Sequence, residues 1–224
     1  MRPIRVWFSK TGNAKYISHL DLNRAMTRAV RRAHIPLWYT EGFNPHPYIT
    51  FALPLSLGQE SAAEPMDIRI ESDMENIEIK KRLSSVMPEG IEITGVSEPE
   101  SGASEICYAE YEIILEFADS GEAANFAMRA AELVSRNGLA AQKPGKQGRQ
   151  KVLKQVELKD YIAGFNAVNK NENVLLTAVL SAGSTKNLNP ALLLETLYSA
   201  TAVSAGAEKI TRKRLLKADF EPFR

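Results

Sequence analysis

All three histidines of the chain lie between residues 19 and 46, within a stretch that also carries four arginines. A histidine side chain exchanges its proton near neutral pH, so His19 or His46 could serve as a general acid or base in RNA cleavage. In that case Lys15 or Tyr16 would stabilise the charge on the phosphate. The alternatives for His19 are structural hydrogen bonding and contact with a ligand or with RNA. We assign no catalytic residue on this evidence.

The histidines also raise the question of a metal site, because imidazole is a common metal ligand. They are separated by 15 and 12 residues, and none of the familiar local ligand pairs is present. The single cysteine, Cys107, cannot build a thiolate cluster, which needs three or four sulfurs. We therefore predict neither a metal site nor a resident cofactor.

The four arginines have the spacing of a helix surface. Three of them sit at i, i+4 and i+7, so neighbouring side chains share one face with roughly 5–6 Å between their Cβ atoms, and their like charges repel one another. A phosphate backbone would relieve this repulsion through bidentate hydrogen bonds and counterion release. The predicted RNA-binding residues of this helix are Arg24, Arg28, Arg31 and Arg32. The alternative is internal pairing with acids of a later segment, namely Glu60, Glu64, Asp67 and Glu71.

A proline-rich turn follows in residues 42–47, with the sequence GFNPHP. The two prolines fix their own φ angles and restrict the residues before them, so Asn44 and His46 should be held extended. Such a turn can present side chains to a base or to a partner, and it can equally close a loop around a buried Phe43. We predict partner or base contact for His19, Phe43, Asn44 and His46.

Charge is unevenly distributed along a chain whose net charge is only +1. Residues 1–48 carry a net charge of +6, and residues 49–100 carry −7. Two further basic runs contain no acid, one in residues 143–154 and one in residues 209–217. The first is rich in glycine and should form a mobile loop or hairpin, with Lys143, Lys146, Arg149 and Lys151 as predicted RNA contacts. Three basic islands suggest a localised positive surface, although each could also be plain solvated charge.

The composition is that of a globular protein, with 44% hydrophobic and 25% charged residues in 224. The N-terminal residues lack the apolar core of a signal peptide, and no apolar run is long enough for a membrane span. A single cysteine fits a reducing compartment. We expect a cytoplasmic protein without membrane contact.

Hydrophobic periodicity predicts strands and helices in the order β-α-β-β-α-β, twice. In the first half we predict strands at 4–10, 36–40, 66–72 and 91–98, and helices from Ser18 to Pro36 and at 76–87. In the second half we predict strands at 107–117, 156–162, 173–183 and 208–218, and helices at 121–138 and 191–200. The predicted fold class is α+β, with two tandem ferredoxin-like domains at 1–101 and 102–224. A single larger mixed sheet is the main alternative.

Several motifs resemble the radical-SAM-linked protein family, a bacterial domain of unknown function. They comprise residues 16–24 (YISHLDLNR), 31–33 (RRA), 42–47 (GFNPHP) and 49–58 (ITFALPLSLG). The resemblance implies a partner, a cobalamin-binding radical SAM enzyme that is fused to or encoded beside the family member. It implies no particular reaction. The single cysteine agrees with such a division of labour, because radical SAM chemistry needs three clustered cysteines.

The predicted layout also resembles RNA-processing proteins with paired ferredoxin-like domains, such as CRISPR pre-RNA endonucleases and tRNA pseudouridine synthases. This is an analogy of fold alone. Our leading hypothesis is a non-catalytic RNA-binding or substrate-presenting partner of a radical SAM enzyme, acting in tRNA or rRNA modification. The alternatives are a metal-independent endoribonuclease and a protein-only interaction module.

Overall fold

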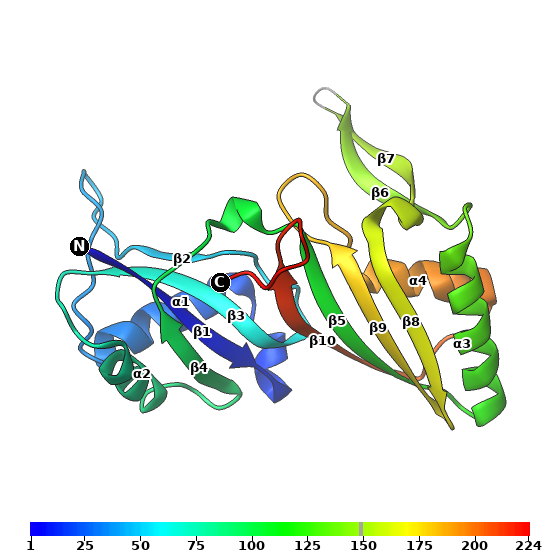
Figure 1. Ribbon diagram of the computed structural model, residues 1–224, viewed down its shortest axis with the longest axis horizontal. Coiled ribbons are helices and arrows are strands. Elements are labelled where there is room, and N and C mark those ends of the chain that lie inside the picture. Colours follow the sequence, from blue (N-terminus) through cyan, green and yellow to red (C-terminus); the bar gives the residue numbers. More distant parts are fainter. Residues whose placement is uncertain (148–149) are drawn as a thin grey trace. The chain divides into compact units, whose positions relative to one another are not determined.

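The computed structural model describes the backbone of residues 1–147 and 150–224, and side chains outside residues 143–154. The chain divides into two compact units (Figure 1). Unit 1 comprises Met1–Ile106 together with Thr211–Arg224, and unit 2 comprises Cys107–Ile210. The sequence interpretation placed a boundary after residue 101 and kept the C-terminal residues with the second half. In the structure the last fourteen residues, from Thr211, belong to unit 1.

Unit 1 is built on an antiparallel sheet in which β1 lies between β3 and β4. Its elements are β1 (Arg2–Lys10), η1 (Gly12–Tyr16), α1 (His19–Arg32), β2 (Ile49–Phe51), β3 (Glu60–Ile70), α2 (Asn76–Ser84), β4 (Ile91–Ser97) and η2 (Ala103–Glu105). The short β2 pairs with the C-terminal half of β3, whose first residues pair in parallel with Thr211 and Arg212 of β10 (Ala207–Leu216). The sheet is therefore mixed.

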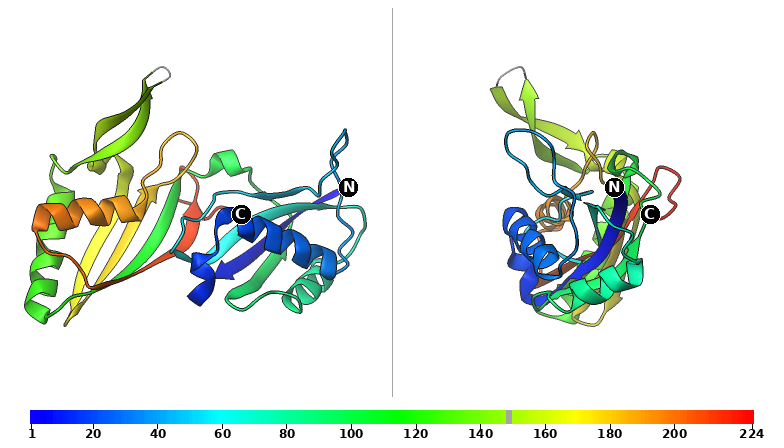
Figure 2. Two further views of the ribbon diagram at one scale, coloured as in Figure 1. Left: turned by 180° about the vertical axis from the view of Figure 1, so that it is seen from behind. Right: turned by 90° about the vertical axis from the view of Figure 1, so that its left-hand side faces the viewer.

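The core of unit 1 follows from two periodicities. In β1, Ile4, Val6 and Phe8 alternate with the residues of the opposite face and are fully buried. In α1, Leu22, Met26 and Val30 recur at helical spacing and are buried in the same cluster. Figure 2 shows α1 and α2 on the same face of this sheet. The helix predicted from Ser18 onward is thus confirmed, and its polar face is turned to solvent.

The opposite face of the unit 1 sheet is covered by the C-terminal residues and the segment after β4. Arg5 is buried there and forms a bidentate ion pair with Asp67, with N–O distances of 2.7 and 2.8 Å. It also donates to the carbonyl of Ser101 at 2.9 Å, and its guanidinium carbon lies 4.3 Å from the ring centre of Phe223. Packing on this face explains why residues 211–224 belong to unit 1.

Unit 2 has the strand order β10-β5-β9-β8, and α3 packs against β8, β9 and α4. Its elements are β5 (Tyr108–Glu116), α3 (Ser120–Ser135), β6 (Ala140–Gln147), β7 (Gln150–Glu157), η3 (Leu158–Tyr161), β8 (Ile162–Lys170), β9 (Asn173–Ser181), α4 (Pro190–Thr201) and the start of β10. Asp119 and Asn189 cap the two helices through their side chains, and Pro190 occupies the first helical position of α4. The strands β6 and β7 form a separate hairpin.

The α+β class is confirmed, and several individual predictions are corrected. Residues 36–40 form only isolated bridges at Leu37 and Tyr39. The strand predicted at 156–162 is instead the end of β7, the helical turn η3 and the first residue of β8. The strand β8 was not predicted, because its sequence IAGFNAVNK alternates only weakly. No helix in the described residues is long and apolar enough to cross a membrane.

Two glycines with the same backbone conformation provide a matched stability test, since Gly90 and Gly58 both have φ of +81°. A Cβ at Gly90 would lie 2.5 Å from the carbonyl oxygen of Thr11, whereas a Cβ at Gly58 would meet nothing within 4 Å. We predict that Gly58→Ala lowers the free energy of unfolding by about 1–2 kcal/mol, the cost of the left-handed conformation. Gly90→Ala should lower the free energy of unfolding by about 1–3 kcal/mol more than Gly58→Ala does, because of the clash with the Thr11 carbonyl. Urea unfolding of both variants measures this, and equal losses would contradict it.

Candidate functional site

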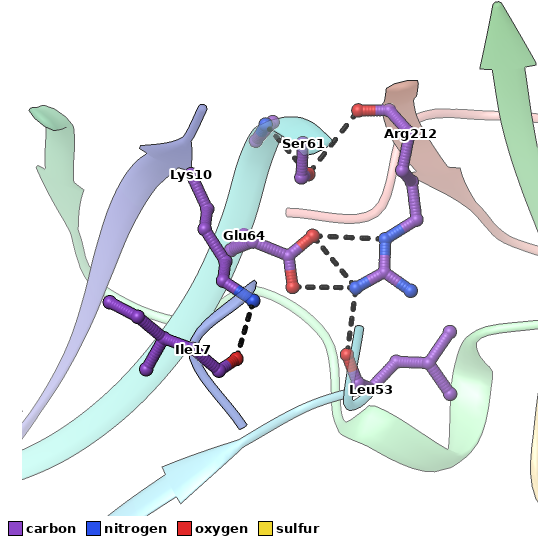
Figure 3. A network of polar contacts seen from close by, with 7 residues as sticks. Lys10, Ile17, Leu53, Ser61, Glu64 and Arg212 are labelled. Carbon is purple, nitrogen blue, oxygen red and sulfur yellow. Dashed lines mark hydrogen bonds and ion pairs between the residues drawn. The ribbon is translucent and has the colours of Figure 1, made fainter. Parts of the chain in front are cut away.

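Three charged side chains are buried together beneath the N-terminus of α1, and we call Lys10, Glu64 and Arg212 the buried charge cluster (Figure 3). Arg212 donates to Glu64 from two nitrogens, with distances of 2.9, 2.7 and 2.5 Å. Both side chains are less than 5% exposed. Because a buried ion pair repays its desolvation only with good geometry and further hydrogen bonds, the remaining partners of the cluster matter.

Lys10 contributes a second buried positive charge, which two main-chain carbonyls solvate. Its Nζ donates to the carbonyl oxygen of Ile17 at 2.9 Å and to that of Lys15 at 3.4 Å. Burial lowers the pKa of Lys10, Glu64 opposes this shift, and Arg212 adds to it. The ammonium thereby ties the end of η1, directly before α1, to strand β1.

Arg212 ties down a second loop. Its Nη2 donates to the carbonyl oxygen of Leu53 at 2.8 Å, and the amide of Gly58 donates to the carbonyl of Lys15 at 2.9 Å. Residues 15–17 and 53–58 are therefore held by the same buried charge cluster and by each other. These are the segments that carry two of the sequence motifs, YISHLDLNR and ITFALPLSLG.

The first turn of α1 is fixed by Ser18 and Asp21. The Ser18 hydroxyl accepts from the Asp21 amide at 3.2 Å and donates to the Asp21 carboxylate at 2.7 Å. This hydrogen bond lowers the pKa of Asp21, and the nearby Arg24 and Arg28 act in the same direction. The cap predicted from the spacing of Ser18 and Asp21 is present.

The four predicted arginines, Arg24, Arg28, Arg31 and Arg32, are all exposed on α1, and we call them the α1 arginines. Arg24 contacts Asp21 at 3.3 Å in an exposed pair, and Arg32 donates to the main-chain carbonyl of Val86 at 2.7 Å. Arg31 lies over the ring of Tyr39, 5.8 Å from its centre. Arg28 makes no hydrogen bond or ion pair with the described residues. Most of the α1 arginines are therefore not neutralised by an ion pair with the described residues.

Internal pairing with the acidic segment was the alternative, and the acids are engaged elsewhere. Glu64 binds Arg212, Asp67 binds Arg5, and Glu60 accepts the amide of Gly12 at 3.1 Å. Glu71 is exposed and forms no ion pair with α1 in the described part of the chain. The sequence suggested that segments of opposite charge would neutralise each other. That alternative is wrong for the α1 arginines.

The proline-rich turn is the tip of a projecting loop between α1 and β2 (Figure 1). Main-chain hydrogen bonds from Thr40 to His46 and from Tyr48 to Trp38 join its two arms, with distances of 2.9 and 3.0 Å. Phe43 is fully exposed at the tip, and Asn44 is exposed beside it. A buried Phe43 was the other possibility from sequence, and it is excluded.

His19 and His46 each make contacts with neighbouring side chains. The ring of exposed His19 lies edge-on to Phe51, with 5.3 Å between the ring centres. Nδ1 of His46 lies 3.0 Å from the Thr40 hydroxyl and 3.2 Å from the Asn44 carbonyl, so it helps to close the loop. Among the described residues no three histidine, cysteine or acidic side chains are grouped to hold a metal ion.

The predicted basic loop is a hairpin in its backbone. Lys143 and Lys146 lie on β6, where Lys146 pairs with Lys151 of β7. Arg149 lies outside the described residues. The hairpin belongs to unit 2 and the α1 arginines to unit 1, so their convergence on one surface stays a prediction. The third basic island is not uniformly exposed, because Arg212 at its centre is buried.

Sequence reasoning missed the buried charge cluster. A signal was present in β1, where Lys10 continues the inward series of Ile4, Val6 and Phe8. A charged residue at an inward position needs a buried partner. That partner, Glu64, could not be identified from spacing, because it lies 54 residues away in sequence.

Fold and site together define an α+β protein with an exposed basic helix above a buried charge cluster. Residues 3–190 match the family described as "Uncharacterized protein conserved in bacteria (DUF2344)". The match covers most of the chain, so the protein belongs to this family. No curated protein matches the sequence.

Solved structures resemble the fold at very low sequence identity. A chain from the crystal structure of a Cbf5-Nop10-Gar1 complex is 9% identical with a TM-score of 0.50, and the alignment covers 94% of this chain and 48% of that one. This chain thus spans about half of that chain's length. An unknown protein from Galdieria sulphuraria is 10% identical with a TM-score of 0.27, and the alignment covers 94% and 98% of the two chains. A heavy metal efflux pump is 8% identical with a TM-score of 0.26, covering 94% and 28%. Only the first supports the fold, and none supports a function.

The buried ion pair can be tested against an exposed one. We predict that Glu64→Gln lowers the free energy of unfolding by about 3–5 kcal/mol, because it leaves the Arg212 guanidinium buried without a counter-charge. Glu78→Gln is the matched control, since Glu78 and Arg82 form an exposed pair at 2.6 Å, and it should hardly move the urea midpoint. Amide hydrogen exchange should also accelerate in residues 15–17 and 53–58 of the Glu64 variant. Similar stability of both variants would contradict the role of the cluster.

Proposed function

We propose that this protein is a non-catalytic RNA-binding or substrate-presenting partner of a radical SAM enzyme in tRNA or rRNA modification. The observation that carries the proposal is the row of α1 arginines, which stays exposed while the nearest acids of β3 bind other residues. Like charges at i and i+4 on a helix destabilise it. A polyanion removes that cost and releases counterions as it binds.

A phosphate backbone suits this row better than a lone acidic group does. The arginines extend from Arg24 to Arg32 along one helix, so a ligand that neutralises them must carry charge repeated along its length. Arginine pairs with phosphate through two parallel hydrogen bonds, which adds geometric selection to the charge. The exposed Phe43 and Asn44 on the projecting loop can add contacts to a base or to the partner enzyme.

We also infer that each unit is a ferredoxin-like fold. The order β4-β1-β3 with β2 beside β3 supports this for unit 1. The order β10-β5-β9-β8 is equivalent in unit 2 when strands are counted within the unit, with the β6–β7 hairpin inserted after α3. Both units then follow the βαββαβ pattern. Sheets of this kind occur in proteins of many functions, so the fold alone does not select RNA.

The radical SAM partner is proposed from the sequence motifs. Residues 16–24 and 49–58 carry the resemblance to the radical-SAM-linked family, and the buried charge cluster holds parts of both segments in place. The chain has one cysteine, so an iron–sulfur cluster would have to be supplied by the partner. We place the pair in the cytoplasm, where thiols stay reduced.

RNA binding is tested by a salt titration with bulk tRNA. We predict binding at low salt whose logarithm falls linearly with the logarithm of salt concentration. Arg28→Ala should weaken binding and reduce the slope by about 1, because one phosphate contact is lost. Arg136→Ala is the matched control, since Arg136 is an exposed arginine on the far end of α3 that pairs with Glu132 at 2.7 Å. This control should leave the slope unchanged.

Two outcomes of the titration would overturn the proposal. Absence of tRNA binding at low salt would exclude RNA as the ligand. Cleavage of the RNA in EDTA by the wild type but not by His19→Ala would make the protein an endoribonuclease instead.

The partnership is tested by a pull-down from cells that scores protein and RNA together. We predict that the tagged full chain recovers a radical SAM enzyme, and that ribonuclease treatment of the lysate leaves this recovery intact because the contact is between proteins. The tag alone is the control. Recovery of RNA without any radical SAM enzyme, after chemical cross-linking, would contradict the partnership but not RNA binding.

A further inference from the structure

Exposed aromatic side chains lie in the segments before and after α1. Four aromatic residues in the described part of the chain are strongly exposed, namely Tyr16, Tyr39, Phe43 and Phe220. Tyr16 is 64% exposed and stands directly before α1, and Tyr39 is 40% exposed beside the end of the helix. These two rings, one in the segment before the helix and one in the segment after it, are accessible to a ligand that can stack on them.

Each of these two tyrosines is accompanied by a cation. The Lys15 ammonium lies 5.2 Å from the ring centre of Tyr16, and the Arg31 guanidinium lies 5.8 Å from that of Tyr39. Arg24 and Arg28 lie between the two pairs along the helix. The surface thus repeats one arrangement at both ends of the helix, a flat ring next to a positive charge. A nucleotide offers the matching groups, a flat base next to a phosphate.

We infer that the ligand of this surface is single-stranded RNA, whose backbone follows the α1 arginines while unpaired bases stack on Tyr16 and Tyr39. This inference rests on the proposed function and names its substrate class. A duplex fits less well, because its bases are already stacked and its A-form grooves are recognised mainly by shape and 2′-hydroxyls. Stacking on aromatic rings requires bases that are free of a partner strand.

The helix sets the length of the strand. The 14 residues of α1 span about 21 Å at 1.5 Å per residue. At the 3.4 Å rise per nucleotide of a strand in duplex DNA, the length of α1 corresponds to about six nucleotides. Phe43, at the tip of the loop that begins near Tyr39, can receive a further base beyond the helix.

The main chain at both tyrosines is held without a bound ligand. Tyr16 ends η1, which the buried Lys10 fixes through the carbonyls of Lys15 and Ile17. Tyr39 is bridged to Pro47 across the arms of the loop. A main chain that is already ordered loses little conformational freedom when a base stacks on these rings, which favours affinity.

The test compares one strand with its duplex. Fluorescence anisotropy measures binding of a labelled, unstructured 10-nucleotide RNA and of the same sequence as a blunt duplex, at equal salt. We expect tighter binding of the single strand. Tyr16→Ala and Tyr39→Ala should each weaken single-strand binding by about 5- to 150-fold and leave duplex binding unchanged. Tyr16→Phe is the matched control, because it keeps the ring and should keep the affinity.

The outcomes separate this inference from the proposed function. The single strand and the duplex could bind equally well, with Arg28→Ala weakening this binding and Tyr16→Ala leaving it unchanged. That result would overturn the single-strand inference and leave RNA binding intact. Loss of all RNA binding in the wild type would overturn both. If Tyr16→Ala spares RNA binding but abolishes recovery of a protein partner, the surface formed by Tyr16 with exposed Leu20 and Leu57 belongs to that protein instead.

Discussion

The buried ion pair between Glu64 and Arg212 is the constraint on which the rest of unit 1 depends. Removing two charges from water is expensive, and an apolar replacement of similar volume would often be as stable. The pair is therefore poorly explained by stability alone. Its geometry explains it better, because Arg212 also binds the Leu53 carbonyl and Glu64 faces the Lys10 ammonium that holds residues 15–17. An apolar side chain has no hydrogen-bond donor, so it could not hold a loop through a main-chain carbonyl. We infer that the cluster is retained because it specifies where these loops lie.

Buried ion pairs engage two of the acids that follow α1 in the sequence, Glu64 and Asp67. Glu64 pairs with Arg212 inside the protein, and on the opposite face of the sheet Asp67 pairs with Arg5. These two acids of residues 49–100 therefore bind buried arginines and not the arginines of α1. In the described part of the chain, the α1 arginines form one ion pair, between Arg24 and Asp21.

Local signals predicted much of the fold, and contacts between distant residues account for what was missed. The helix α1, its Ser18 cap and the strand β1 follow from periodicities of a few residues, and all three are present. The basic run at 209–217 suggested an exposed surface, yet Arg212 is buried against Glu64. The sequence could not show this pairing, because the two residues are 148 positions apart. Exposure of Phe43 could not be predicted either, since a proline-fixed turn can hide or display a ring equally well. The α1 arginines were found because helical spacing alone places them outside.

The α1 arginines and the exposed aromatic rings would contribute differently to selectivity among RNAs in the proposed function. Contacts from arginine to phosphate contribute affinity that depends on salt and hardly on sequence, so the α1 arginines alone would bind any RNA. Stacking on Tyr16, Tyr39 or Phe43 selects for unpaired bases but tolerates every base, because each has a flat face. Base-edge hydrogen bonds would have to come from other groups, such as the amide of the exposed Asn44 beside Phe43. In the proposed function, charge and stacking would hold an unpaired strand of any sequence, and a sequence preference would have to come from base-edge contacts.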